Sequence, residues 1–221
     1  MNRKYPNKEI AEKELQIAGE LNPGPWVEHS RNTGLACRYI AEKCLNLDAE
    51  KAYVLGILHD IGRRVGVVST SKHVVEGYKY AMEQGWQDAA RVCMTHSFIR
   101  KDFKVNSKNT TEEELKETFF IREYLNEIAY DDYDKLVQLC DSLAIAEGFC
   151  LLEKRFVDVA RRYGVGEHTV DKWNAIFGIK DYFEEKMGCS VYEVLPNVKE
   201  TTFMDVPLWG RQNIISKRSW V

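Results

Sequence analysis

The feature that most constrains this chain is the stretch from Tyr53 to Arg63, which has the sequence YVLGILHDIGR. The six residues before His59 are apolar or glycine, and a helical run of that composition is buried on most sides. His59 and Asp60 follow at its inner end, where a carboxylate without a partner is costly or must take up a proton. A cation, a tight hydrogen-bond network or a bound metal solves this problem, and adjacent His and Asp side chains suit a metal with mixed nitrogen and oxygen ligands. The metal hypothesis predicts further ligands elsewhere in the chain.

The composition is ordinary for a soluble globular protein. Of 221 residues, 44% are hydrophobic and 29% are charged, which is enough for one domain with a full core. The net charge of -3 and the lack of a Lys/Arg block give no reason to expect binding to a nucleic acid polymer. No apolar run approaches the ~20 residues of a membrane helix, and the N-terminal segment lacks the apolar core of a secretory signal. The six cysteines form no CxxC pair, which favours reduced thiols and a cytoplasmic location.

Hydrophobic periodicity and breaker residues predict a succession of helices. Asp48 is a candidate N-cap for the helix that carries His59 and Asp60, and Gly62 is expected to end or bend that helix. The segments 65–71 and 97–110 are predicted loops, and the second is long enough to cover a site. The other helices are expected at about 7–20, 26–44, 72–84, 86–96, from 111 onward, 131–147, 151–163 and 169–186.

From Gly188 onward the helical pattern ends. Residues 191–195 form a candidate short strand, and the rest is predicted as an irregular tail. There is no internal repeat and no convincing second-domain boundary. We therefore expect an all-α fold with a helical core over residues 1–187 and an irregular C-terminal extension over residues 188–221 that packs on the same domain.

Four more polar residues stand at the ends or on the apolar faces of predicted core helices: His29, His73, His96 and Asp141. Taken singly, a histidine at a helix end is more often a cap or a satisfied core residue than a ligand. Asp141 alone can bond a neighbouring helix N-terminus, and the His59-Asp60 doublet alone can form a buried ion pair. A metal site requires instead that all of these side chains lie together.

The order of these residues resembles the HD-domain superfamily, which is named for its His-Asp doublet. The resemblance covers roughly residues 29–148, and its nearest likeness is to small, stand-alone bacterial HDIG hydrolases. It is specific because five motifs occur in the family's order: EHS at 28–30, LHDIGR at 58–63, HVVEGY at 73–78, THSF at 95–98 and LCDSLA at 139–144.

This resemblance implies an HD-domain helical bundle with metal at its centre. The implied metal ligands are His29, His59, Asp60, His73, His96 and Asp141. All of them except His73 and His96 would hold one metal, and the Asp60 carboxylate would bridge to a second metal held by those two histidines. One or two divalent transition metal ions are expected, and the ligand types do not choose among iron, manganese, zinc, cobalt and nickel. Two such ions lower the pKa of a bridging water and clamp a phosphoryl group during in-line attack.

Asp60 and Arg63 are the candidate catalytic residues. Arg63 follows Asp60 by three residues and His59 by four, so the three share one helical face. A guanidinium there can take two phosphate oxygens and neutralise charge in the transition state, although a surface salt bridge is the alternative. Weaker basic candidates around the same mouth are Arg64, Lys72, Arg100 and Lys101.

The function predicted from these residues is a metal-dependent phosphohydrolase that acts on a small phosphorylated substrate, a nucleotide or dinucleotide. No GxSxG motif is present, so a serine hydrolase is disfavoured. Two alternatives remain open. The same six ligands hold two irons in HD-domain oxygenases that cleave C–C or C–P bonds with dioxygen, and some family members are non-catalytic signalling or binding modules. The sequence leaves the oligomeric state open.

Overall fold

The computed structural model describes residues 4–101 and 111–204. Within these residues the regular structure is helical apart from one sheet of two short strands, so the all-α expectation is confirmed. Residues 102–110 of the predicted 97–110 loop and the tail from residue 205 lie outside the described residues. The elements are α1 (Lys8–Leu21), α2 (Trp26–Ala41), α3 (Ala49–Leu58), the 3-10 helix η1 (Ile61–Val65), α4 (Thr70–Glu83), α5 (Gln87–Thr95), α6 (Glu112–Glu127), α7 (Asp132–Leu143), β1 (Ala144–Ile145), β2 (Gly148–Phe149), α8 (Leu152–Tyr163), α9 (Thr169–Met187), α10 (Val191–Val194) and α11 (Val198–Phe203).

Side-chain caps fix the starts of the helices that surround the core. The predicted cap Asp48 is confirmed, because its carboxylate accepts a hydrogen bond from the Lys51 backbone N–H at 2.9 Å. Thr111 and Asp131 open α6 and α7, each with a reciprocal capping box. These caps satisfy backbone donors that the first turn of a helix leaves unpaired.

A glycine on each of two helices lets α2 and α3 approach closely. A Cβ on Gly56 would lie 2.6 Å from the Gly34 Cα, and a Cβ on Gly34 would lie 2.2 Å from the Ile57 side chain. A larger residue at either position would force the two helices apart. Their close contact brings His29 of α2 and His59, just after α3, to a ring-centroid separation of 5.5 Å.

A third glycine lets η1 pack against α4. A Cβ on Gly62 would lie only 1.9 Å from the His73 backbone oxygen, so no other residue fits without moving the chain. Helix α3, which was expected to carry His59 and Asp60 and to end or bend at Gly62, ends at Leu58 with His59 as its C-cap. The chain continues as η1 from Ile61. Gly62 therefore allows the close contact between η1 and α4, and it does not mark the end of α3.

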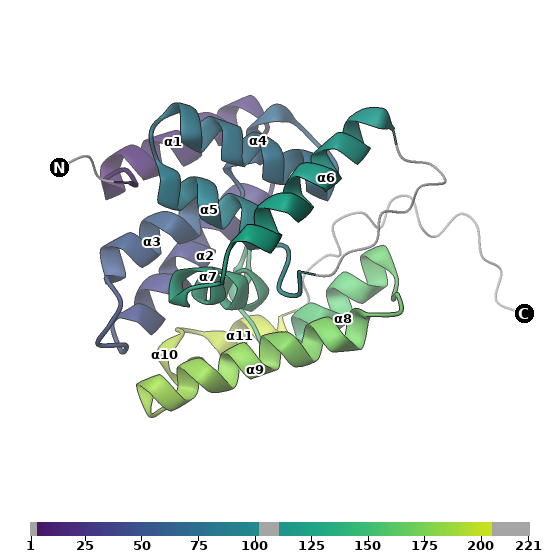
Figure 1. The fold of residues 1–221 in the computed structure, drawn as a ribbon. Helices are drawn as coiled ribbons and strands as arrows, with labels where there is room; N and C mark the ends of the chain where they lie inside the picture. Colours follow the sequence, from purple (N-terminus) through teal and green to yellow (C-terminus); the bar gives the residue numbers. More distant parts are fainter. Residues whose placement is uncertain (1–3, 102–110, 205–221) are drawn as a thin grey trace, which may run out of the picture.

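The C-terminal helices lie along one side of the bundle formed by α1 to α7 (Figure 1). The strand predicted at 191–195 is wrong, because Val191–Val194 is the short helix α10, whose first turn is capped by the Ser190 side chain. α11 follows, so the extension is helical as far as the described residues reach. Val191 and Leu195 join the main hydrophobic core, but the division of the chain into domains stays a prediction.

The helix predicted over 131–147 ends at Leu143. The next residues form a tight antiparallel hairpin, in which Ala144 pairs with Phe149 and Ile145 with Gly148. Gly148 has a φ of 139°, a backbone conformation that favours glycine. This hairpin lies against α2 and turns the chain directly into α8.

No helix among the described residues combines the length and apolar character that crossing a membrane requires.

Candidate metal centre

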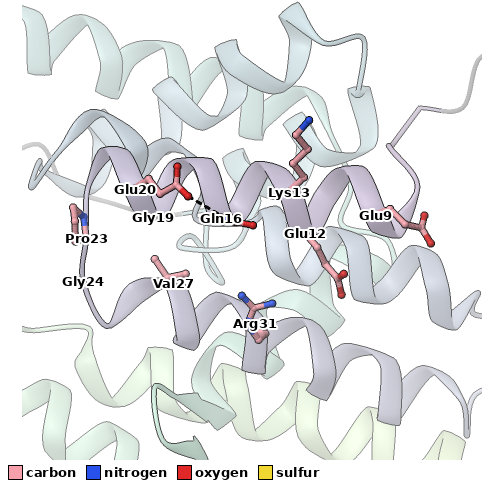
Figure 2. Close-up of a pocket in the computed structure, with 10 residues that line it drawn as sticks. All are labelled: Glu9, Glu12, Lys13, Gln16, Gly19, Glu20, Pro23, Gly24, Val27 and Arg31. Atoms are coloured by element: carbon pink, nitrogen blue, oxygen red, sulfur yellow. Dashed lines mark hydrogen bonds between the residues drawn. The ribbon is translucent and has the colours of Figure 1, made fainter.

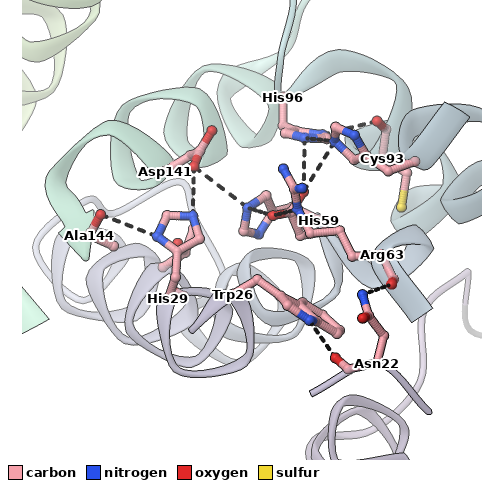
Figure 3. Close-up of polar contacts among 12 residues, drawn as sticks. Asn22, Trp26, His29, His59, Arg63, Cys93, His96, Asp141 and Ala144 are labelled. Atoms are coloured by element: carbon pink, nitrogen blue, oxygen red, sulfur yellow. Dashed lines mark hydrogen bonds and ion pairs between the residues drawn. The ribbon is translucent and has the colours of Figure 1, made fainter. Parts of the chain in front are cut away.

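The six predicted ligands converge, although they come from five parts of the chain. Figure 3 labels four of them, namely His29, His59, His96 and Asp141. The elements that carry the six ligands are α2 for His29, the α3–η1 junction for His59 and Asp60, α4 for His73, the end of α5 for His96, and α7 for Asp141. The side chains of both central residues, His59 and Asp60, are almost fully buried, at 0% and 5% exposed. The sequence therefore predicted which side chains meet.

One half of the centre is formed by His29, His59 and Asp141. The His29 Nε2 atom lies 2.8 Å from the Asp141 Oδ1 atom, and the His59 Nε2 atom lies 3.7 Å from the same oxygen. One ligand atom from each residue lies within 4.8 Å of the others, close enough for a single ion.

The two oxygens of Asp60 face different histidines. Its Oδ1 lies 3.2 Å from the His73 Nε2 and 3.5 Å from the His96 Nε2, whereas its Oδ2 lies 3.8 Å from the His59 Nε2. His59, Asp60 and His96 form a second group whose ligand atoms lie within 4.8 Å of one another. Asp60 thus lies between the two halves, as a shared carboxylate must.

Backbone carbonyls orient all four imidazole rings through their Nδ1 atoms. The acceptors are Ala144 O for His29 at 3.2 Å, Gly56 O for His59 at 2.7 Å, Ser69 O for His73 at 3.2 Å, and both Val92 O and Cys93 O for His96 at 3.1 and 3.0 Å. Because a carbonyl oxygen only accepts, each Nδ1 must carry the proton. A neutral imidazole then has its lone pair on Nε2, the atom that faces the centre in each case, which is the arrangement of a metal-ligating histidine.

Two polar atoms at the centre have no hydrogen-bond partner among the described residues: His59 Nε2 and Asp60 Oδ1. Leaving such atoms buried and unsatisfied costs free energy, and a charged carboxylate oxygen costs most. A metal ion would satisfy both, and neutral imidazoles with carboxylates are a donor set that divalent transition metals accept. The residues present therefore fit a metal site.

The electrostatic environment favours ionised carboxylates at the centre, and these carboxylates attract positive charge to the atoms beside them. Burial raises the pKa of Asp60, but His59 and Arg63 outweigh it and hold that pKa well below its usual range. Burial also raises the pKa of Asp141, but His29 and His59 outweigh it and lower that pKa. Burial lowers the pKa of His29, whereas the two carboxylates outweigh burial to raise the pKa of His59. Anionic carboxylates thus face the centre and favour positive charge there.

Arg63 lies beside the centre. Its Nε donates to the Asp60 Oδ2 at 2.5 Å, and the Asn22 side chain donates to the Arg63 backbone oxygen at 2.7 Å (Figure 3). Its salt-bridge partner is a buried residue of the centre, so the alternative of a purely surface ion pair does not describe it. Its role in catalysis stays a prediction.

The four weaker basic candidates are each engaged by groups of the protein. Arg64 lies over the Tyr80 ring and near Glu14, Lys72 pairs with Glu113, Arg100 pairs with Asp171, and Lys101 donates to the Ile128 backbone oxygen. These partners reduce the charge that these side chains can offer to a substrate.

Sequence reasoning missed two neighbours of the centre. The first is the Ala144 carbonyl that holds His29, and a backbone acceptor leaves no signal in residue type. The second is Arg155 of α8, whose positive charge adds to burial in lowering the pKa of His29. Arg155 lies beyond the segment that resembles a known family, in an ordinary amphipathic helix, so nothing in the sequence distinguishes it.

A groove elsewhere on the surface lies between α1 and the start of α2 (Figure 2). Its lining mixes acidic and basic side chains, including Glu9, Glu12, Lys13 and Arg31, and contains none of the six predicted ligands. The geometry of a metal centre is therefore found only at the buried histidines among the described residues.

Comparison with known proteins gives one match. The HD-domain family model matches residues 26–146, which include every one of the six predicted ligands. No curated protein and no solved structure matches the chain.

Proposed function

This chain belongs to the HD-domain family, and on that premise we propose that it is a metal-dependent phosphohydrolase that cleaves a small phosphate ester, with a nucleotide or dinucleotide as substrate. The family match indicates a superfamily of the metal-dependent phosphohydrolase type, and the buried His/Asp cluster is compatible with a metal site. The single observation that carries the proposal is the pair of unsatisfied buried atoms, His59 Nε2 and Asp60 Oδ1, at the point where the imidazoles converge.

The ligands proposed for one metal are His29, His59, Asp60 and Asp141, and those for a second are Asp60, His73 and His96. When bound, divalent ions supply Lewis-acid polarisation of a phosphate oxygen and a nucleophilic water at neutral pH. The backbone carbonyls that hold the imidazoles keep the Nε2 atoms aimed inward, so the site needs little reorganisation.

Arg63 is proposed to bind the phosphate. Its Nε is used by Asp60, which leaves the two terminal nitrogens of the guanidinium for phosphate oxygens. The side chain is 36% exposed, so solvent and substrate can reach it while Asp60 keeps it beside the centre. A fixed guanidinium there neutralises negative charge that develops on the phosphoryl oxygens.

A cytoplasmic location is part of the proposal. All six cysteines are free thiols in the structure, five of them buried, which is typical of a chain that folds in a reducing compartment.

The test is metal analysis of the freshly purified protein, followed by a screen of nucleotides and other phosphate esters with and without oxygen. We expect one to two transition metal ions per chain, and release of inorganic phosphate or a nucleoside monophosphate without oxygen consumption. Turnover that stops without oxygen and returns with it would replace this proposal with the di-iron oxygenase. Metal-loaded protein that turns over no substrate and still binds a nucleotide would favour the non-catalytic module.

A further inference from the structure

The short helix η1 carries both candidate catalytic residues, with Asp60 as its N-cap and Arg63 inside it. A 3-10 helix has poorer hydrogen-bond geometry than an α-helix, so a segment of five residues depends on its neighbours for a fixed position. The end of η1 lies at the surface, where Val65 is 49% exposed and the C-cap Gly66 has a φ of 124°. The neighbours that hold η1 therefore decide where the Arg63 side chain starts.

Two residues of η1 anchor it to the bundle on either side of Arg63. Gly62 packs against α4 so closely that a Cβ there would lie 1.9 Å from the His73 backbone oxygen. The Arg64 guanidinium lies 3.8 Å from the centroid of the Tyr80 ring, also on α4. These contacts hold the η1 helix, but neither acts on Arg63 itself.

The contact on the Arg63 main chain comes from Asn22, the C-cap of α1. The Arg63 carbonyl oxygen accepts from the Gly66 N–H at 3.0 Å and from the Asn22 side-chain amide at 2.7 Å. Asn22 is itself fixed, because its backbone N–H donates to Ala18 O at 3.0 Å and its own carbonyl accepts from the Trp26 indole at 2.8 Å (Figure 3). Trp26 is the first residue of α2, which carries His29 three residues later.

Arg63 is thus held at two points. Asp60 accepts from its Nε, and Asn22 holds its backbone oxygen. The ion pair alone leaves the guanidinium free to turn about its contact with the carboxylate, whereas a fixed main chain limits the positions that the two terminal nitrogens reach. A binding group that is already oriented loses less conformational freedom when its ligand arrives.

We propose that Asn22 is a positioning residue, which fixes the main chain at Arg63 so that the guanidinium meets a phosphate group at the metal centre. This inference rests on the proposed function. In it Asn22 does not touch the substrate and acts only through Arg63. It gives α1 a part in the activity, although α1 and its C-cap lie outside residues 26–146, the segment that the family model matches.

The test is binding of inorganic phosphate to the metal-loaded full-length protein, measured by calorimetry. Asn22→Ala removes the amide donor and keeps the backbone hydrogen bonds of this residue to Ala18 and Trp26. We expect it to weaken phosphate binding by about threefold to tenfold, because Arg63 loses part of its fixed orientation. Asn22→Gln retains an amide donor and should recover part of the lost affinity.

The Arg63→Ala background separates positioning from a general loss of stability. There, Asn22→Ala should cause no further loss of phosphate affinity, because the group that Asn22 positions is absent. A loss of equal size in both backgrounds would show that Asn22 does not act through Arg63, and it would overturn the inference.

Asn7→Ala is the matched control, because Asn7 caps the other end of α1 by accepting from the Ile10 N–H at 2.9 Å. It should lower the melting temperature as the loss of a cap does, yet bind phosphate within about twofold of the wild type. A loss of affinity equal to that of Asn22→Ala would assign the effect to the stability of α1 and overturn the inference.

Two further outcomes separate this inference from the proposed function. If Arg63→Ala weakens phosphate binding and Asn22→Ala binds like the wild type, the inference is wrong and the proposed function stands. If the metal-loaded wild type does not bind phosphate, or if Arg63→Ala binds it as tightly as the wild type, the inference fails together with the proposed phosphate-binding role of Arg63.

Discussion

The histidine–aspartate centre and the Arg91–Asp134 ion pair draw on the same two helices, α5 and α7, yet their polar atoms are satisfied in different ways. Asp134 is fully buried, and both of its oxygens have donors. Oδ1 accepts from Arg91 Nε at 3.1 Å and Thr95 Oγ1 at 2.9 Å, and Oδ2 accepts from Arg91 Nη2 at 2.6 Å and the Asp131 backbone N–H at 2.8 Å. At the centre, by contrast, His59 Nε2 and Asp60 Oδ1 have no hydrogen-bond partner among the described residues.

The difference separates a structural network from a site that needs a ligand. A buried carboxylate can be stabilised by donors of the chain itself, as Asp134 is by Arg91 and Thr95. In the part of the chain that the structure describes, Asp60 has one such donor, Arg63, and its other oxygen faces imidazole nitrogens that need a cation between them. Mutations in the Arg91–Asp134 network should therefore lower stability, whereas mutations in the histidine–aspartate centre should lower metal content and activity.

The largest expected effect is on the centre. Asp60→Ala should remove bound metal and lower kcat/KM by about three orders of magnitude or more, because it deletes the carboxylate shared by both halves. Metal analysis and turnover of the identified substrate measure this directly. A chelator should lower the melting temperature of the wild type, since metal bound only to the folded state stabilises it.

The same chelator should leave the melting temperature of Asp60→Ala almost unchanged, because that variant has no metal to lose. We expect the same loss of metal, and the same insensitivity to the chelator, in His59→Ala. A wild-type metal content in either variant would contradict the assignment of these residues as ligands.

The next effect is on the satisfied network. Asp134→Ala removes the carboxylate that accepts from Arg91 and Thr95, and it should reduce the free energy of unfolding by about 2–3 kcal/mol. The lower end of the range applies if water reaches Arg91, whose side chain is 27% exposed. Denaturant unfolding measures the loss. Metal content below the unfolding transition should stay at the wild-type value, and a parallel loss of metal would mean that the two networks are not separable.

Arg63 provides a smaller effect that tests the link between the centre and its substrate. Arg63→Ala should reduce kcat/KM by about tenfold to a hundredfold, because a charge-assisted contact to phosphate is lost, while bound metal stays at its wild-type level. Steady-state kinetics and metal analysis on the same preparation separate the two. Unchanged kinetics on an active substrate would show that Arg63 does not bind the phosphate and only forms its ion pair with Asp60.

The smallest effect concerns Asp132, a carboxylate nearer the surface. Burial raises its pKa, but hydrogen bonds from Lys186, Tyr182 and Asn46 outweigh this and lower it to about 2. A folded-state pKa below the unfolded value contributes stability above about pH 4, and this is lost as the pH falls toward about 2. Asp132→Asn should therefore flatten the fall in unfolding free energy over this range by about 1–2 kcal/mol.

Equilibrium unfolding at several pH values between 2 and 7 checks this prediction. The metal content at neutral pH should not change, since Asp132 accepts from Lys186, Tyr182 and Asn46, none of which is a predicted ligand. An unchanged acid dependence in Asp132→Asn would show that folding does not lower the pKa of this carboxylate.

The sequence was informative where one local pattern determines the outcome. The cap at Asp48, and the existence of the helices around the six ligands, follow from residue type and period. Residues 191–195 were misassigned because VYEVL is rich in β-branched and aromatic residues, whereas Ser190 caps a helical turn and Val191 is buried against the core. Arg155 was missed because its closeness to His29 depends on the hairpin that follows Leu143, and no local pattern predicted that hairpin.

The backbone carbonyls that hold the four imidazoles have a consequence for mutational scanning. Every residue type has a carbonyl oxygen, so no single replacement at Gly56, Ser69, Val92 or Ala144 deletes the group that sets the histidine tautomer. A scan across this domain should therefore identify the ligands themselves, and Gly56 through its close packing on α2, but no side chain that orients an imidazole by a hydrogen bond. The tautomers are set by the backbone, within one helical turn for His59, His73 and His96 and from the hairpin for His29.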